Sequence, residues 1–210
     1  MRVLINPRRS ALQPQPMPAE LVLIRQPSHR MGLAISAFVG LVIPVIPCLL
    51  LSIGSTLFRR AGISTDETIP WWIIFPVLGV CVVTHELLHV IGDPGWGRSA
   101  QSIVLIWPRR LQLGVYYDGF MKRSRWLVMR LAPLVGLTLV PTLFLLLAYP
   151  SELSFFWQQF VVLVILVNSL GAGSDLAASI IVARQVPTHG EIGIWNGRAC
   201  WRSSEAVLYW

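Results

Sequence analysis

Two histidines and a glutamate stand close together in the run His85-Glu86-Leu87-Leu88-His89. Histidines four residues apart lie on one face of a helix, so both can offer an imidazole nitrogen to the same zinc ion. Glu86 would then lie beside the open coordination position, where it can take a proton from water and pass it to a leaving amine. The run therefore predicts zinc-dependent hydrolysis of peptide bonds.

A catalytic zinc ion normally has three protein ligands, and the motif supplies two. His85 and His89 lie within two turns of the end of their apolar stretch. Asp175 lies about nine residues before Arg184, where the last apolar stretch ends, so the two sites should have similar depth in a membrane. We expect Asp175 to be the third ligand.

Other residues remain open as the third ligand. Asp93 follows His89 by one helical turn, but it precedes Pro94 at the expected end of the helix. The remaining candidates can equally be solvated loop or tail residues: Asp118, His189 and Glu191. Cys81 lies one turn before His85, and we interpret it as a buried packing residue and not as a ligand.

Asn168 precedes Asp175 by two helical turns. Its amide can bind substrate backbone, and it can equally bridge two helices. Nitrogen and oxygen ligands accept several divalent metals, so the expectation of zinc rests on the motif and not on the donor atoms alone.

The composition places the chain in a bilayer. Of the 210 residues, 54% are hydrophobic and 13% are charged, and the mean hydropathy is +0.63, unlike a soluble domain. The net charge of +7 comes from Lys and Arg between apolar stretches, which favours anionic lipid and not nucleic acid as a partner. The cysteines lack CxxC spacing, so no cysteine zinc site is expected.

Four apolar stretches are long enough to cross a hydrocarbon core, which takes about 20 helical residues. They are residues 31–58, 69–92, 131–149 and 153–183. We expect an all-α multi-pass membrane protein whose residues 31–184 form one metallopeptidase-like domain, with tails at residues 1–30 and 185–210. Gly171 and Gly173 favour a bent or interrupted last helix.

The distribution of Lys and Arg predicts the orientation in the membrane. The N-terminal tail has five, the segment from Arg98 to Arg130 has seven and the chain from Arg184 has three, which is fifteen of seventeen. By the positive-inside rule, both termini and the central loop, residues 93–126, are cytoplasmic in a cell membrane such as a bacterial inner membrane. The motif is then near the cytoplasmic face.

The polar segments contain strand signals. Residues 102–107 and 111–117 are rich in Ile, Val and Tyr, and Pro108-Arg109-Arg110 separates them, so the central loop should form a β-hairpin. Shorter strand-like runs are at residues 21–24, 192–195 and 206–210. A hairpin of this kind can hold an unwound substrate by strand addition.

Three segments together resemble the "putative zincin peptidase" family of small bacterial membrane proteins, long catalogued as a domain of unknown function. They are His85 to His89, Arg130-Leu131-Ala132-Pro133-Leu134, and Asn168 through Gly173-Ser174-Asp175-Leu176. The first is the most specific, and the resemblance extends over roughly residues 70 to 185.

The chain is also distantly similar to the site-2-protease group of intramembrane metalloproteases, which implies Asp175 as the third ligand. It departs from that group in two ways. No proline lies between Asn168 and Asp175, and Leu176 follows the aspartate where the group has glycine. Details of substrate guidance therefore do not transfer.

The favoured function is an intramembrane zinc metallopeptidase that cuts membrane-protein or peptide substrates near the cytoplasmic face. The alternative is a non-catalytic membrane scaffold or chaperone that keeps the metal for structure. A transporter with a metal in its path is a third class, disfavoured because the chain lacks the inverted repeat common in such folds.

Overall fold

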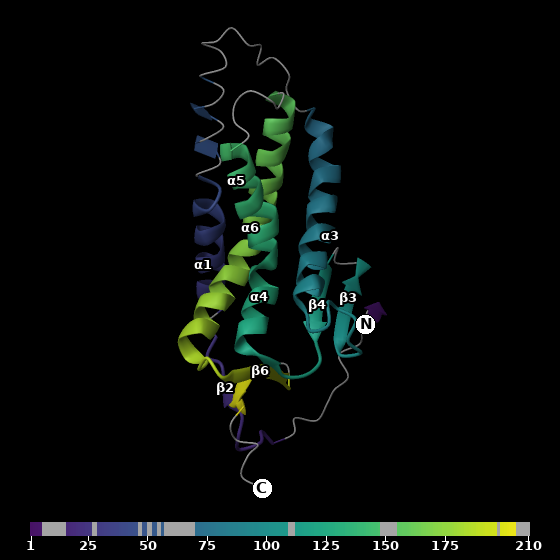
Figure 1. Cartoon of the computed structure of the whole chain (residues 1–210), viewed down its shortest axis with the longest axis vertical. Coiled ribbons are helices and arrows are strands. Elements are labelled where there is room, and N and C mark those ends of the chain that lie inside the picture. The colour runs from purple at the N-terminus through teal and green to yellow at the C-terminus, as the bar shows by residue number, and fades with distance from the viewer. Residues whose placement is uncertain are drawn as a thin grey trace. The chain divides into compact units, whose positions relative to one another are not determined.

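A computed structural model describes residues 1–5, 16–26, 29–45, 48–49, 52–53, 56, 70–108, 112–147, 155–196 and 198–204. Helices predominate, and short strands stand before, between and after them (Figure 1). In chain order the elements are β1 (Arg2–Ile5), β2 (Val22–Leu23), α1 (His29–Val42), the 3-10 turn η1 (Trp71–Ile73), α3 (Ile74–Gly92), β3 (Ser102–Trp107), β4 (Gln112–Tyr117), β5 (Met121–Lys122), α4 (Arg123–Leu134), the π-helical turn η3 (Val135–Leu139), α5 (Val140–Leu147), α6 (Phe155–Gln185), β6 (Gly190–Trp195) and β7 (Arg198–Ser203).

The chain forms two compact units. The helical unit comprises His29–His85 and Pro133–Ala177, and the sheet unit comprises Met1–Ser28, Glu86–Ala132 and Ala178–Trp210. Helices α3, α4 and α6 each contribute residues to both units.

Three helical segments are long and apolar enough to cross a membrane: Trp71–Gly92, Arg123–Leu145 and Phe156–Gln185. They correspond to three of the four predicted spans. The middle one begins at Arg123 and not at Leu131, because the basic run before Leu131 continues the helix. The predicted first span, residues 31–58, is helical in α1, and much of the rest of it lies outside the described residues.

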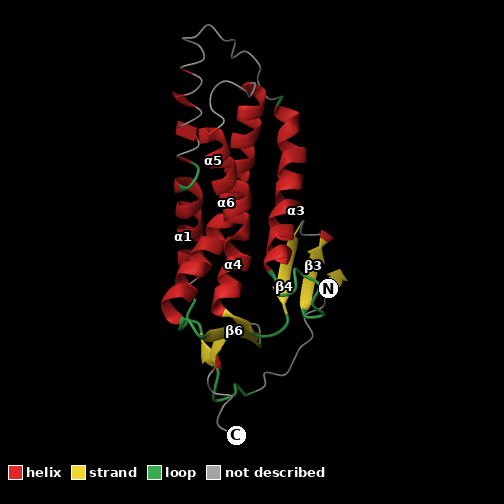
Figure 2. Ribbon diagram, viewed as in Figure 1, coloured by secondary structure: helices red, strands yellow, loops and turns green. Residues whose placement is uncertain are grey.

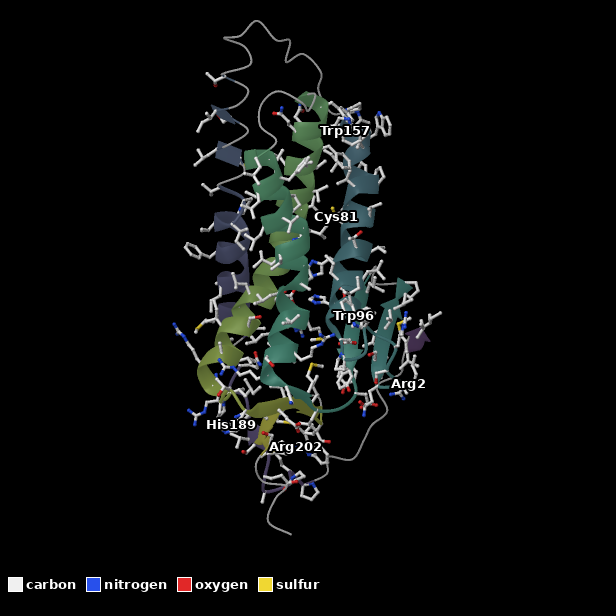
Figure 3. All side chains as sticks on the ribbon, in the orientation of Figure 1. Arg2, Cys81, Trp96, Trp157, His189 and Arg202 are labelled. Atoms are coloured by element: carbon white, nitrogen blue, oxygen red, sulfur yellow. The ribbon has the colours of Figure 1, made fainter. Side chains whose placement is uncertain are left out.

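Helix α3 exposes large apolar side chains along much of its length, among them Phe75, Val80 and Leu87. A helix with this surface is suited to lipid and poorly suited to water. Trp71 before α3 is also exposed. So is Trp157 near the start of α6 (Figure 3), and aromatic residues of this kind are typical of a membrane interface.

Helix α6 is continuous over its 31 residues, so the helix is not interrupted at Gly171 and Gly173, and the bend predicted as the alternative stays a prediction. A Cβ atom on Gly171 would lie 3.6 Å from Cε1 of His85, an ordinary van der Waals distance, so the imidazole ring packs beside this part of α6.

The helical unit is closely packed between α6 and its neighbours. A Cβ atom on Gly40 of α1 would lie 3.1 Å from the Ser169 carbonyl oxygen, so the two backbones approach closely. Leu145 of α5 packs with Val162 and Ile165 of α6 in a buried cluster. These contacts fix the part of α6 that carries the polar residues Asn168 and Asp175.

The sheet unit contains two small sheets (Figure 2). One has the order β1-β3-β4, in which β3 and β4 form the predicted antiparallel hairpin and β1 adds in parallel to β3. The other has the order β2-β7-β6-β5, and Ile192 of this sheet packs against Val182 and Val186 at the end of α6. The hairpin prediction is therefore confirmed.

The other strand predictions have different outcomes. Residues 21–24 and 192–195 contain β2 and part of β6, as predicted, whereas residues 206–210 lie outside the described residues. Strands β1 and β7 were not predicted. Strand β7 follows β6 after Asn196, which has a positive φ of 48°.

Gly92 ends α3, and the backbone of α4 lies close to it. A Cβ atom on Gly92 would lie 2.4 Å from Cα of Met129, and backbone atoms cannot move aside cheaply. We predict that Gly92→Ala lowers the free energy of unfolding by about 1–3 kcal/mol, as overpacking does. Thermal unfolding in detergent measures this.

Gly79 in the same helix is the matched control, because a Cβ atom there would meet nothing within 4 Å. Gly79→Ala should leave stability unchanged or raise it by up to about 1 kcal/mol, since alanine favours helix. Equal stability of the two variants would contradict this prediction, because it would show that the backbone at Met129 moves away from an added Cβ atom without loss of stability.

Candidate metal centre

Helix α3 holds the two histidines one turn apart. The helix ends where Pro94 cannot continue it and Gly95 takes a positive φ of 67°. Arg125 donates a hydrogen bond to the carbonyl of Asp93 at 2.5 Å, which places a cation at the helix C-terminus. His85 and His89 are thus carried on a rigid element and not on a loop.

The His85 ring has polar neighbours on both of its nitrogens, and both neighbours come from α6. Its Nδ1 lies 2.9 Å from Oδ1 of Asn168, and its Nε2 lies 3.1 Å from Oδ2 of Asp175. An amide oxygen only accepts, so Nδ1 must donate to Asn168. Nε2 then faces Asp175, the carboxylate of the potential ligand group.

The amide of Asn168 is oriented by two further hydrogen bonds. Its Nδ2 donates to the Pro133 carbonyl at 3.0 Å and to Oγ1 of Thr138 at 2.9 Å. Both amide protons are used there, which turns Oδ1 toward His85. Asn168 therefore bridges helices and also orients a ring of the motif.

His89 is buried, and its Nδ1 donates to the backbone carbonyl of Met129 in α4 at 2.8 Å. The carbonyl can only accept, so Nδ1 carries a proton and donates it. Histidine ligands of metals commonly donate their other ring proton in this way, which fixes the tautomer and the ring orientation.

Asp175 completes a group of potential ligands. The ligand atoms of His85, His89 and Asp175 all lie within 4.8 Å of one another, and the carboxylate side chain is only 5% exposed. For bonds of about 2.0–2.2 Å in tetrahedral geometry, two ligand atoms are about 3.3–3.6 Å apart, close to the spacing of His85 and Asp175. Two imidazoles and a carboxylate fit zinc.

Glu86 is half-buried on α3 between the two histidines. Its side chain is the carboxylate that the motif places beside the metal ligands, and it is separate from the ligand group itself. A carboxylate next to the ligands in sequence, and not among them, is suited to proton transfer.

Two of the alternative ligands, Asp118 and Glu191, form ion pairs with arginine side chains. Asp118 forms an exposed ion pair with Arg2 at 2.8 Å, and Glu191 pairs with Arg202 at 2.9 Å. Figure 3 shows Arg2, Arg202 and the exposed His189 among the strands. None of these residues belongs to the group of three potential ligands among the described residues.

Asp93 and Cys81 are also separate from that group within the described part of the chain. Asp93 is fully buried just beyond α3, and burial raises the pKa of its carboxyl, while Ser102, His89 and Arg125 oppose that shift. Cys81 is buried on α3, as the sequence predicted, one turn before His85 (Figure 3).

Sequence reasoning missed three residues around the site: Met129, Pro133 and Thr138. Met129 and Pro133 act through backbone carbonyls, which carry no signal of residue type. Thr138 is an ordinary threonine in an apolar stretch. The nearest available signal was the proline in the run Arg130-Leu131-Ala132-Pro133-Leu134, because a proline within a helix frees a carbonyl.

Two imidazoles carried on α3 and a carboxylate on α6 form a group that could hold a metal ion. The chain belongs to the family described as "Putative zincin peptidase", whose family model matches residues 78–189, more than half of its length. The matched range includes the motif, Asn168 and Asp175. No curated protein and no solved structure matches the chain.

Proposed function

We propose that this protein is a membrane-embedded zinc metallopeptidase that hydrolyses peptide bonds of membrane-protein substrates near the cytoplasmic face. Its family membership supports the metallopeptidase role. The three helices long and apolar enough to cross a membrane support a site within the bilayer. Both termini are cytoplasmic in this proposal, since Lys and Arg cluster in the tails and the central loop.

One observation carries the proposal more than any other. Nδ1 of His85 and Nδ1 of His89 each lie within hydrogen-bonding distance of an oxygen acceptor, and the ligand atoms of the two histidines and Asp175 lie within 4.8 Å of one another. Metal-binding histidines commonly have such an acceptor at the other ring nitrogen, because it fixes which nitrogen faces the metal.

The residues of the chain have separate tasks in peptide hydrolysis. When bound, zinc would lower the pKa of a water molecule and polarise the carbonyl of the scissile bond. Glu86 takes the proton of the attacking water on its carboxylate and then gives it to the departing amine nitrogen. His85, His89 and Asp175 hold the ion, and Asn168 keeps the His85 ring in place.

The sheet unit offers a place to hold an extended substrate. Strand β4 is at the end of its sheet in the order of the described strands, so one of its edges is open to a further strand. A cavity of about 190 Å³ is lined by Val115, Tyr116 and Tyr117 of this strand and by Met129 of α4. Strand addition there would present an unwound peptide, whose bonds are accessible to hydrolysis.

Removal of the metal tests the proposed function. The purified protein should contain one zinc ion per chain. In proteoliposomes it should cleave members of a library of single-span helical peptides, and mass spectrometry detects the products. Treatment with a chelator should abolish cleavage, and stoichiometric zinc should restore it, because the three ligands hold the ion reversibly.

The same experiment separates the alternative function. A non-catalytic scaffold or chaperone that uses the metal for structure would lose thermal stability on chelation but cleave no peptide before or after it. Cleavage that persists after complete removal of the metal would contradict the proposed function.

A further inference from the structure

Helix α4 is irregular where it passes the two histidines. Pro133 lies inside the helix, and the π-helical turn Val135–Leu139 follows it, with Val140 N–H bonded to the Val135 carbonyl five residues back. Both features disturb the regular hydrogen bonding of a helix, and such irregular turns often occur at functional sites.

Pro133 explains why the Met129 carbonyl is available to His89. In a regular helix that carbonyl would accept from the N–H of residue 133, but proline has no N–H, and its ring pushes the carbonyl four residues earlier away from the axis. The Met129 carbonyl instead accepts from Nδ1 of His89 at 2.8 Å. The close approach of Met129 to Gly92 brings it within reach.

The next part of the same stretch acts on the other histidine. The Pro133 carbonyl accepts one amide proton of Asn168, and Oγ1 of Thr138, within the π-helical turn, accepts the other. Thr138 and Asn168 are both buried, so water does not compete for these bonds. Asn168 then has only its oxygen to offer to Nδ1 of His85.

We infer that the irregular stretch Met129–Thr138 is a positioning device that sets the tautomer of both metal-binding histidines. Pro133 acts on His89 by freeing the Met129 carbonyl, and Pro133 with Thr138 acts on His85 through Asn168. This inference rests on the metal site of the proposed function and does not depend on peptidase activity. Pro133 and Thr138 are positioning residues, since neither belongs to the ligand group.

Zinc affinity of paired variants tests the inference. Pro133→Ala restores an N–H that competes for the Met129 carbonyl, and Thr138→Val removes an acceptor of Asn168. Each should weaken zinc binding about 10–100-fold, the usual effect of losing a partner of a metal ligand. Competition with a chromophoric chelator in detergent measures the affinity, and thermal unfolding is followed alongside.

Two control variants repeat the same substitutions, Pro→Ala and Thr→Val, at neighbouring positions. Pro141→Ala changes the other proline of this region, and Thr142→Val removes a hydroxyl that bonds within the helix to the Thr138 carbonyl. Both should keep wild-type zinc affinity, and Thr138→Ser should restore what Thr138→Val loses. Wild-type affinity in Pro133→Ala and Thr138→Val, or equal losses in the controls, would overturn the inference.

A second readout does not need the metal. In the metal-free protein, NMR of the ring nitrogens should show the His89 proton on Nδ1 in a hydrogen bond, and Pro133→Ala should shift that signal or lose it. An unchanged His89 signal in Pro133→Ala would overturn the inference. If the wild-type protein does not bind zinc, the proposed function is contradicted. The NMR signal of His89 in Pro133→Ala would still test whether Pro133 positions the His89 ring.

Discussion

Replacing Glu86 with Gln should lower peptide cleavage by a factor of about 100 to 10,000, the usual contribution of a general base. The amide has nearly the shape of the carboxylate but cannot accept the proton of the attacking water. Zinc content should stay at the wild-type level, because Glu86 is not one of the three grouped ligands. Peptide cleavage in proteoliposomes and metal analysis of the same sample give both quantities.

The matched control is Glu20→Gln, the same chemical change at an exposed residue of the N-terminal tail. It should retain wild-type cleavage and zinc content. If zinc-loaded Glu86→Gln still cleaves peptides at the wild-type rate, Glu86 has no part in proton transfer. If no variant and no wild-type preparation cleaves, the scaffold alternative gains support.

Asp175→Asn should lower zinc affinity by at least about 100-fold, more than the loss of a hydrogen-bond partner of a ligand does. The change keeps the size of this buried side chain but removes the charge that faces Nε2 of His85 at 3.1 Å. Cleavage should be lost with the metal. Chelator competition and thermal unfolding, measured on the same preparation, separate lost binding from lost folding.

Asp118→Asn is the corresponding control, because Asp118 is exposed and pairs with Arg2 in the sheet unit. It should bind zinc as the wild type does. If Asp175→Asn instead keeps wild-type affinity, the third ligand is another residue, and Asp93 is the first to test because it is buried and near His89.

Much of the fold follows from hydropathy. The three long helices were predicted because a membrane span requires a long apolar stretch, which composition alone reveals. The hairpin of β3 and β4 was predicted because β-branched and aromatic residues stand on either side of a proline-containing turn. These signals are local, so one sequence is enough to read them.

Strand β1 could not be predicted in this way. It has four residues, Arg2–Ile5, and its partner is β3, where Arg2 stands opposite Ile103. Pairing across so many residues depends on the tertiary fold and leaves no local pattern. Strand β7 is different, since Asn196-Gly197 between it and β6 is a strong hairpin signal that was overlooked.

The continuity of α6 decides one half of a local prediction. Glycines in a helix favour a kink or a break in isolation, but Ala172 and Asp175 beside them are buried, and the helix is not interrupted. At position 171 a Cβ atom would lie at an ordinary van der Waals distance from His85, so the space there does not require glycine. A single sequence does not show whether packing keeps a glycine-containing helix uninterrupted.

At the site, the sequence predicted side chains and missed the backbone. Spacing on one helix predicted His85, Glu86 and His89, and matched depth selected Asp175. The structure brings His85, His89 and Asp175 together, and the role of Glu86 stays a prediction. The role of the Met129 and Pro133 carbonyls was not evident, because any residue has a carbonyl. Only the structure relates the proline in α4 to the histidine ring in α3.

The identity of the metal ligands is the central claim, and X-ray absorption spectroscopy of the zinc-loaded protein tests it most directly. The spectrum should show two imidazole nitrogens at about 2.0–2.1 Å and a carboxylate oxygen at about 2.0–2.2 Å. In Asp175→Asn, loaded at high zinc concentration, the carboxylate oxygen should be lost. An unchanged spectrum in that variant, or a wild-type spectrum with sulfur or fewer than two imidazoles, would contradict a centre built from His85, His89 and Asp175.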